Sequence, residues 1–425
     1  MRLCIFEDAG VSGLEPIALV RPAFDLRCGT ATLFDKHVRT FRHRAVGALV
    51  RPHVARVAAR ARPHVVVNES SWVQAEPTIL VNARWLPPRR FQLTRAEGPW
   101  VAVLGDTIAY AVLPPNHLVD CTPQNVDACL AAWRSRLPGR PAGGRLARYL
   151  WDLVEWNGDE IAADFPHLGH DDMDGWPTTL TLVGPSDALW VADTARVDPF
   201  VVADTTSGPV VIDHDAVVTS FTRLEGPCYI GQRSQVFAAN VRAGTTIGPN
   251  CRVGGEISAS ILIGNGNKSH EGYLGHSYVG EWVNLGAGTH VSDLRNDYAT
   301  VPVTVGGRPA DTRLTKVGAF IGDHVKAAVG CRLNAGSHIG PFAQLLPCGP
   351  FLPKYVPSFC IVDHGRVIAC QDPQALFDAA VRVTGRRGEE FTDAHRALYK
   401  GLYDRAATHR RTAIHEAELR RLRHG

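Results

Sequence analysis

Residues 212–236, IDHDAVVTSFTRLEGPCYIGQRSQV, decide the fold of the second half of the chain. Every sixth residue from the first is aliphatic: Ile212, Val218, Leu224, Ile230 and Val236. A period of six fits neither an amphipathic helix nor a simple alternating strand. It is typical of a prism whose flat faces are short parallel strands, with one aliphatic side chain per face pointing inward and a turn at each corner. Because such a coil buries its apolar row only by stacking on its neighbours, we expect several successive coils.

The aliphatic row continues beyond this stretch, with three interruptions. Its further members are Val241, Ile247, Val253, Val279, Leu285, Val291, Ile321, Ala327, Leu333, Ile339 and Leu345. Breaks in the six-residue spacing predict a phase slip near Ala238, an insertion after Ile263 and a longer insertion between Asp293 and Lys316. A solenoid expels insertions as loops, and binding groups collect on loops. The alternative, a β-rich domain with accidental spacing, is disfavoured by the number of matches.

Length and composition limit the remaining possibilities. A chain of 425 residues favours two or three domains. The apolar fraction of 45%, the charged fraction of 20% and the net charge of +3 are typical of a soluble protein without a general attraction to nucleic acids or membranes. The ten cysteines show no C-x-x-C pair, which favours a reducing compartment. The first residues, MRLCIFEDAG, do not form the apolar core of a signal peptide, so we expect a cytoplasmic protein.

The repeat resembles that of the hexapeptide-repeat acyltransferases over roughly residues 189–356. This resemblance implies a left-handed parallel β-helix, an exception to the right-handed crossover rule. Acyl transfer to an amine needs a base that removes a proton as the nitrogen attacks the thioester, and histidine suits this task near neutral pH. His270, in the polar segment 266–297, is the candidate base. The alternative is a polar loop whose histidines make only local hydrogen bonds. Candidate ligands of sugar and phosphate are Lys268, Tyr273, Arg313, Lys316 and Lys326.

Two motifs make the resemblance narrower. His-x-x-Tyr-Leu-Gly from His270 and the later Val-Asn-Leu-Gly-Ala-Gly-Thr look like the acetyltransferase half of the bifunctional glucosamine-1-phosphate acetyltransferase and N-acetylglucosamine-1-phosphate uridylyltransferase. The resemblance implies that His270 is the catalytic base, that Tyr273 and Asn284 contact the amino sugar, and that Lys268 substitutes for a phosphate-binding lysine. The segment LTKVGAFIGDHVKAAVG, residues 314–330, resembles a region that lines the acetyl-CoA groove. The implied acetyl-CoA contacts are Gly286, Ala287, Lys316, Gly318, Ala319 and Lys326.

Two positions depart from this family pattern. The family carries an Asn-Tyr pair after the Gly-Ala-Gly-Thr turn, where this chain has Asp293 and Leu294. A second histidine, His276, lies beside the resumed repeat, and we expect it to make only a local hydrogen bond.

The N-terminal segment LEPIALVRPAFDLRCG, residues 14–29, resembles the start of sugar-1-phosphate nucleotidylyltransferases. The motif lysine is replaced by Ala23, so the resemblance leaves Arg21 and Arg27 as the nearby cations for a nucleoside triphosphate. The reaction implied is metal-assisted in-line attack of a sugar phosphate, with Mg²⁺ held by carboxylates. Asp25, Glu69 and Asp106 are candidate replacements for the metal ligands, which remain unidentified. Together with Asn-Lys-Ser-His and Val-Pro-Ser-Phe farther on, the segment looks like a divergent branch of putative sugar nucleotidyltransferases, an alternative version of the bifunctional enzyme.

The expected fold class is an α/β nucleotidyltransferase-like domain followed by a left-handed parallel β-helix with a helical tail. The α/β domain spans residues 1–144, a connecting helix 145–168, the β-helix 169–370 and the tail 371–425. Apolar residues at helical spacing predict the connecting helix. The tail is rich in arginine, and we expect an amphipathic helix packed on the solenoid rather than a site for an acidic ligand.

The resemblance therefore implies a homotrimeric transferase of cell wall biosynthesis that makes a UDP-N-acetylglucosamine-type activated sugar. Its partners would be a sugar phosphate, a nucleoside triphosphate and acetyl-CoA, with Mg²⁺ if the N-terminal domain is active. Nucleic acids and membranes are not expected partners. Two alternatives remain. One is an acetyl-CoA-dependent acyltransferase acting on another amino or nucleotide sugar, with an inert N-terminal domain. The other is a noncatalytic scaffold that binds sugar nucleotides.

Overall fold

The computed structural model describes residues 1–93, 98–169, 177–347, 349 and 351–424, which form two compact units. The first contains Met1–Leu14, Ala18–Arg27 and Ala31–Tyr149. The second contains Glu15–Ile17, Cys28–Thr30 and Leu150–Gly425. Each unit has its own sheets, so each is described by itself.

The first unit is built on a seven-stranded sheet in the order β10-β8-β9-β6-β1-β4-β5. Strand β1 is parallel to β4 and β6, whereas β9 is antiparallel to its neighbours β6 and β8. The central strands RLCIF and TILVN are almost entirely buried, as expected of parallel strands covered on both faces. The strands are β1 (Arg2–Phe6), β4 (Val46–Leu49), β5 (Val66–Val67), β6 (Thr78–Asn82), β8 (Trp100–Leu104), β9 (Thr107–Leu113) and β10 (Gly139–Pro141). The helices are α1 (Leu33–Thr40), α2 (Ala55–Ala61), α3 (Ser70–Gln74) and α4 (Val126–Arg136). Two short pairs complete the unit, β2 (Arg27–Cys28) with β3 (Ala31–Thr32) and β7 (Trp85–Leu86) with β11 (Arg145–Leu146).

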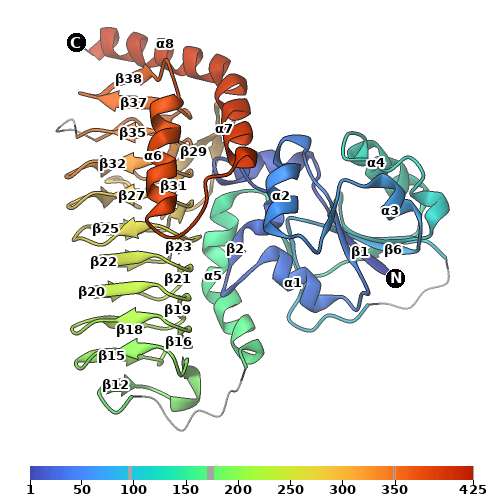
Figure 1. Ribbon diagram of the computed structural model, residues 1–425, viewed down its shortest axis with the longest axis horizontal. Coiled ribbons are helices and arrows are strands. Elements are labelled where there is room, and N and C mark those ends of the chain that lie inside the picture. The colour runs from blue at the N-terminus through green and yellow to red at the C-terminus, as the bar shows by residue number, and fades with distance from the viewer. Residues whose placement is uncertain (94–97, 170–176, 348, 350, 425) are drawn as a thin grey trace. The chain divides into compact units, whose positions relative to one another are not determined.

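The second unit is a parallel β-helix with three faces, which the chain visits in a fixed order in each coil (Figure 1). Face 1 consists of β13 (Leu189–Val191), β16 (Val210–Ile212), β19 (Cys228–Ile230), β21 (Thr245–Ile247), β23 (Ile261–Leu262), β26 (Tyr278–Val279), β31 (Ala319–Ile321), β34 (Ser337–Ile339) and β36 (Tyr355–Val356). Face 2 consists of β14 (Arg196–Val197), β17 (Val217–Val218), β24 (Asn267–Lys268), β27 (Asn284–Leu285), β32 (Lys326–Ala327), β35 (Gln344–Leu345) and β37 (Cys360–Asp363), with β38 (Arg366–Ala369) antiparallel at the end. Face 3 consists of β12 (Leu180–Val183), β15 (Val201–Asp204), β18 (Arg223–Glu225), β25 (Tyr273–Gly275), β28 (His290–Val291) and β33 (Arg332–Leu333). Strands β20 (Gln235–Val241) and β22 (Arg252–Ser258) run from face 2 around the corner onto face 3.

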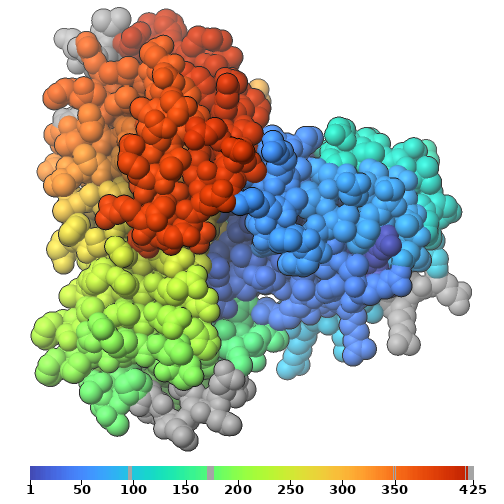
Figure 2. Space-filling view, viewed as in Figure 1, coloured from blue at the N-terminus to red at the C-terminus, as the bar shows by residue number. Residues whose placement is uncertain are grey.

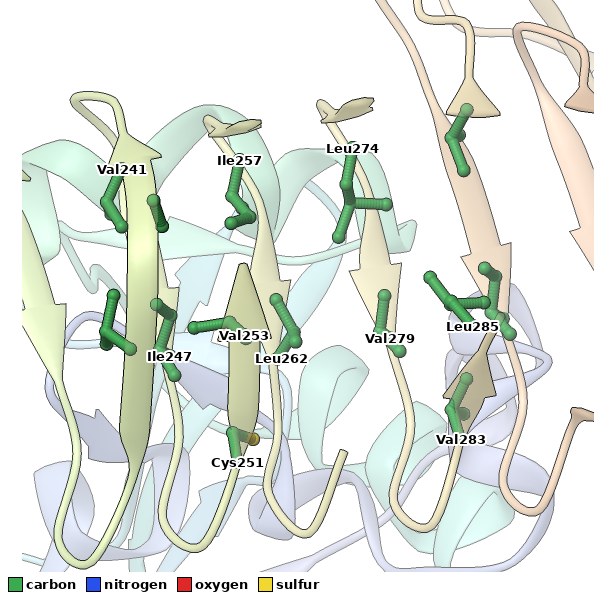
Figure 3. Close-up of a cluster of buried hydrophobic side chains, with 14 of the residues drawn as sticks. Val241, Ile247, Cys251, Val253, Ile257, Leu262, Leu274, Val279, Val283 and Leu285 are labelled. Carbon is green, nitrogen blue, oxygen red and sulfur yellow. The ribbon is translucent and has the colours of Figure 1, made fainter. Parts of the chain in front are cut away.

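The six-residue row forms the core of this β-helix. Every aliphatic member predicted from the sequence is at most 2% exposed and belongs to one hydrophobic cluster. Figure 3 shows part of this cluster, including Val241, Ile247, Val253, Val279 and Leu285, with side chains pointing inward from successive strands. The predicted architecture, an α/β domain followed by a parallel β-helix with a helical tail, is confirmed. Among the described residues, no helix is long and apolar enough to cross a membrane.

Two of the three predicted interruptions are confirmed. The register shifts between Phe237 and Asn240, at the predicted phase slip. The long insertion after Asp293 carries a hairpin formed by β29 (Pro302–Val305) and β30 (Arg308–Asp311). Strand pairing continues on both sides of each break, because β20 pairs with β22 on either side of the shift and β26 pairs with β31 across the long insertion.

The predicted insertion after Ile263 is wrong. Strand β24 follows Ile263 after a short turn, and its Lys268 pairs with Val253 of the previous coil. Lys268, which is 2% exposed, therefore occupies an inward position of the aliphatic row. The row seemed interrupted because its member at this position is a lysine.

Helix α5 (Leu150–Asp164) packs on face 1 of the β-helix. The ring centroids of Trp151 and Phe320 lie 5.9 Å apart, and the Asn157 side chain donates to the Gly244 carbonyl at 2.8 Å. Because Asn157 Oδ1 also accepts from the Gly29 amide at 2.7 Å, the short segment Cys28–Thr30 belongs to this unit as well.

The tail contains α6 (Gln374–Gly385), α7 (Asp393–Arg405) and α8 (Ala407–His424). Figure 2 shows the orange and red residues of the tail covering coils from the yellow to the orange part of the chain. The corner between faces 1 and 2 carries His324, Phe342 and Phe359, all with positive φ. Such a backbone is unfavourable for bulky residues, but it lets their rings stack at centroid distances of 4.6 and 5.0 Å. Tyr399 of α7 covers this column at 4.8 Å from Phe342, so packing rather than propensity holds the tail in place.

Candidate functional site

The corner between faces 2 and 3 carries His270. This side chain is exposed, in a tight turn between β24 and β25 rather than in an expelled loop. The next coil turns directly against it, because the Gly288 amide donates to the Glu271 carbonyl at 2.9 Å. Gly286 and Ala287 belong to that neighbouring turn, where the Gly286 amide donates to the Ala327 carbonyl at 2.9 Å. The structure thus brings the predicted base close to two of the predicted acetyl-CoA contacts.

Lys268 lies just before this corner but points into the β-helix. Its ammonium donates to the carbonyls of Gly254 at 2.7 Å and His270 at 3.1 Å. Burial lowers the pKa of Lys268 to about 8, although the nearby Glu271 carboxylate opposes this shift. Lys268 therefore fixes the turn that carries His270, and its ammonium is not displayed on the surface.

The corner between faces 3 and 1 carries a cluster of three polar side chains, Tyr273, His276 and Asp293. The Tyr273 hydroxyl and the His276 ring Nδ1 each lie 2.7 Å from the same carboxylate oxygen of Asp293. Both side chains are sheltered, with that of His276 17% exposed and that of Asp293 10% exposed. Burial favours a raised pKa for Asp293, but the hydrogen bonds from His276 and Tyr273 outweigh it and hold that pKa below the usual value. The cluster fixes both ring orientations, and a carboxylate-bound histidine ring is a typical acid–base arrangement.

Three more of the predicted acetyl-CoA contacts gather at this second corner. The Gly318 amide donates to the His276 carbonyl at 2.9 Å, and the Ala319 amide donates to the Ser277 hydroxyl at 2.9 Å. A side chain at position 318 would collide with the Gly275 carbonyl, which explains the glycine. Lys316 forms an isolated bridge with Leu294, and its charge acts on Asp293.

The remaining candidates of the β-helix, Asn284 and Lys326, lie on face 2. They are paired in register on neighbouring strands, and both line one cavity. The Lys326 ammonium donates to the Trp282 carbonyl, and burial lowers the pKa of Lys326 to about 8. The predicted site residues are thus divided among two corners and one face of the same prism.

Sequence reasoning missed the cluster around Asp293. The prediction that His276 makes only a local hydrogen bond is wrong, because its partner is on the following coil. The signal was present: His276 and Asp293 are 17 positions apart, and 17 is also the spacing of the paired residues Leu274 and Val291. Residues one coil apart stack at the same corner, so the spacing alone places the two side chains together.

In the first unit, acidic and basic residues meet where the parallel strands end. Glu7, which follows β1, accepts from the Arg51 Nε at 3.0 Å and from the Ala23 amide at 2.8 Å. Asp8 accepts from the Arg84 Nη2 at 2.6 Å, and Arg84 is only 5% exposed. This edge is where ligands bind in open α/β sheets. Here two sheltered ion pairs occupy part of it.

The predicted nucleotide contacts of this unit are less accessible than expected. Arg21 is 8% exposed, and its carbonyl accepts from Arg51 at 2.9 Å. Arg27 is half-buried in β2. The Arg21 guanidinium would need a local rearrangement to reach a triphosphate from solvent.

The candidate magnesium ligands do not converge. Asp25 forms an ion pair with Arg62 at 2.7 Å. Asp106 lies in the turn that joins β8 to β9, whereas Glu69 follows β5. In the sheet, β9 and β5 are four strand spacings apart, which is about 19 Å. In the described residues no group of three acidic, histidine or cysteine side chains could hold a metal ion. These three carboxylates therefore do not fit a shared Mg²⁺ site.

Comparisons with known proteins give a family match to the N-terminal part of the chain and several similar relatives. Residues 3–172 match a family model described as sugar nucleotidyl transferase. The chain is 35% identical over 151 residues to a bifunctional sugar-1-phosphate nucleotidylyltransferase/acetyltransferase of Sulfurisphaera tokodaii, in a match covering 33% of this chain and 36% of the relative. It is 36% identical over 104 residues to the bifunctional protein GlmU of Methanococcus maripaludis, covering 24% of this chain and 25% of the relative. The chain thus spans about a third or less of the length of these curated relatives.

A solved UDP-N-acetylglucosamine acyltransferase from Francisella novicida is 15% identical, with a TM-score of 0.29, over 49% of this chain and 73% of that one. A score of this size supports no conclusion about function. The matches to sequences are stronger, and the relatives that they identify are transferases. Residues 3–172 are thus similar to the sugar nucleotidyl transferase family, and the curated relatives of the chain are bifunctional nucleotidylyltransferase/acetyltransferases.

Proposed function

We propose that the β-helix transfers an acetyl group from acetyl-CoA to the amine of an amino-sugar phosphate, with His270 as the base. The observation that carries this proposal is the exposed His270 ring beside the Gly286–Ala287 turn of the next coil. A base needs access to a soluble substrate, and glycine-flanked backbone allows a thioester to approach closely. In the reaction the amine nitrogen forms a bond to the acetyl carbon, the carbon–sulfur bond breaks, and His270 takes the amine proton while coenzyme A leaves as the thiolate.

We propose further that the active enzyme is a homotrimer whose sites are shared between chains. His270 and His276 are six positions apart at opposite edges of face 3, so up to about 20 Å of extended chain separates them. One chain alone therefore presents two half-sites, and a neighbouring prism would complete each. The corner between faces 2 and 3 also carries Phe200 and Phe221, which are 68% and 73% exposed and stack at 5.8 Å. Such exposed rings favour a contact with a second copy.

For the first unit we propose nucleotidylyl transfer, which would yield a UDP-N-acetylglucosamine-type product for cell wall biosynthesis in the cytoplasm. The family match over residues 3–172 supports it. In this reaction Arg21 and Arg27 would contact the triphosphate. The second candidate is an acyltransferase with an inert first unit. It is favoured by the Glu7–Arg51 and Asp8–Arg84 pairs, which satisfy the charged groups at the sheet edge without a ligand.

Two assays on the full-length protein test these proposals separately. Thiol release from acetyl-CoA, with glucosamine 1-phosphate and other amino sugars as acceptors, tests acetyl transfer. Pyrophosphate release, with Mg²⁺, each common nucleoside triphosphate and N-acetylglucosamine 1-phosphate, tests nucleotidylyl transfer. Thiol release without pyrophosphate release supports the second candidate. If neither product forms, the protein is a scaffold and both proposals fail.

A further inference from the structure

A cavity of about 290 Å³ lies on face 2, where α6 ends. Its walls come from the strands or adjoining turns of four successive coils and from the residues at the end of α6, so the C-terminal tail is part of the site. Ten described residues line it, and four of them are cations: Arg252, Lys326, Arg386 and Arg387. None of the ten is acidic.

The positive charge of this cavity is not neutralised within the described part of the chain. The Arg387 guanidinium donates to the Asn250 carbonyl and the Lys326 ammonium to the Trp282 carbonyl, so both are held by neutral acceptors. Burial lowers the pKa of Arg387, and the charges of Arg252 and Arg386 lower it further. Four cations gathered around one cavity repel one another, and an anion between them removes that repulsion.

The other walls are suited to a small polar ligand. Asn267 donates to the Asn284 side chain at 2.6 Å, and both amides face the cavity. The Asn265 side chain donates to the Glu281 carboxylate at 3.4 Å, and its own buried amide oxygen has no hydrogen-bond partner among the described residues. Trp282 adds an apolar ring surface. A volume near 300 Å³ is at the small end of ligand pockets and fits a phosphate group with part of a sugar or nucleoside.

We propose that this cavity binds the phosphate group of a small phosphorylated molecule, with Arg252 and Arg386 as its exposed cationic contacts. One guanidinium group can donate two parallel hydrogen bonds to two oxygens of a phosphate. The exposed side chains of Arg252 and Arg386 can turn toward such a ligand. The inference rests on the cavity and its charges and does not require His270 to be the base. It gives the arginine-rich tail a binding role, in addition to the packing that its sequence predicts.

The test is to titrate small phosphorylated probes into the full-length protein and to measure their binding by calorimetry and by tryptophan fluorescence. The probes are coenzyme A, dephospho-coenzyme A, glucosamine 1-phosphate and inorganic pyrophosphate. Arg252→Gln and Arg386→Gln remove the exposed cations, and circular dichroism checks that each variant keeps its fold. Arg382→Gln is the matched control, because Arg382 is exposed on α6 but does not line the cavity.

Hydrogen bonds to charged groups are strong enough that each of the two cavity variants should weaken binding roughly tenfold or more, whereas the control should change it less than twofold. The probe that binds most tightly identifies the source of the phosphate, and a preference for coenzyme A over its dephospho form assigns the 3′-phosphate. Absence of binding for every probe at millimolar concentration would overturn the proposal. Equal dissociation constants for the cavity variants and Arg382→Gln would overturn it too.

Discussion

Replacing Lys268 by methionine tests whether an ammonium group is held inside the β-helix. Burial lowers the pKa of Lys268 from 10.5 to about 8 in the folded chain. Between these two values the unfolded chain binds more protons than the folded one, so the free energy of unfolding of the wild type rises with pH in this window. A shift of this size corresponds to about 3 kcal/mol, and the side chain is only 2% exposed, so solvent screening is weak.

The Lys268→Met variant has no ammonium and should lack this rise. The variant loses the hydrogen bonds to the Gly254 and His270 carbonyls at every pH. The informative quantity is therefore how the difference in the free energy of unfolding between wild type and variant changes with pH. Urea unfolding followed by circular dichroism, from pH 7 to pH 11, should show the wild type gaining about 3 kcal/mol relative to the variant. Lys400→Met, at an exposed position of α7, is the control and should give a constant difference. A constant difference for Lys268→Met as well would refute the buried ammonium.

Three further predictions concern the second corner, the first unit and assembly. Asp293→Asn should lower the local stability of its corner by about 1–2 kcal/mol at pH 7, measured by hydrogen exchange, because charge-assisted hydrogen bonds become neutral ones. The loss should vanish well below pH 4, because a carboxylate whose folded pKa is depressed loses its stabilising effect as pH falls through that pKa. Asp297→Asn, at an exposed position, is the control and should change hydrogen exchange little. Arg21→Ala and Arg27→Ala should each raise the nucleoside triphosphate concentration needed for pyrophosphate release and leave acetyl transfer unchanged; a change in both activities would contradict separate sites. Light scattering should give a trimeric mass for the wild type and a smaller one for Phe221→Glu, whereas a monomeric wild type would remove the shared site.

The sequence predicted the β-helix well because one physical rule governs its whole core. Each coil must bury one aliphatic side chain per face, and all the predicted members, from Ile212 to Leu345, are buried. The same rule failed at Lys268. A lysine at an inward position breaks an aliphatic pattern, although two backbone carbonyls satisfy its ammonium. Hydropathy alone cannot distinguish such a position from an expelled insertion.

The candidate site was harder to predict, because it depends on how coils stack. The motif around His270 identified the turn but not its neighbours on the next coil. His276 and Asp293 look unrelated along the chain, and their hydrogen bond appears only when the coil length is known. The cavity beside α6 depends on where the tail packs, which the repeat does not specify. In the first unit, the pairing of Glu7 with Arg51 and of Asp8 with Arg84 follows from strand order, which sequence reasoning did not establish.

The most direct test of the account is the rate of thiol release from acetyl-CoA with glucosamine 1-phosphate for the wild type, His270→Ala and His276→Ala. General-base catalysis contributes roughly a hundredfold to ten-thousandfold, so His270→Ala should lower turnover by that order while the fold and coenzyme A binding stay intact. His276→Ala, which loosens the Asp293 half-site but keeps the proposed base, should lower turnover much less. If His270→Ala keeps near wild-type turnover across the pH range, or if only His276→Ala abolishes it, the proposed base is wrong.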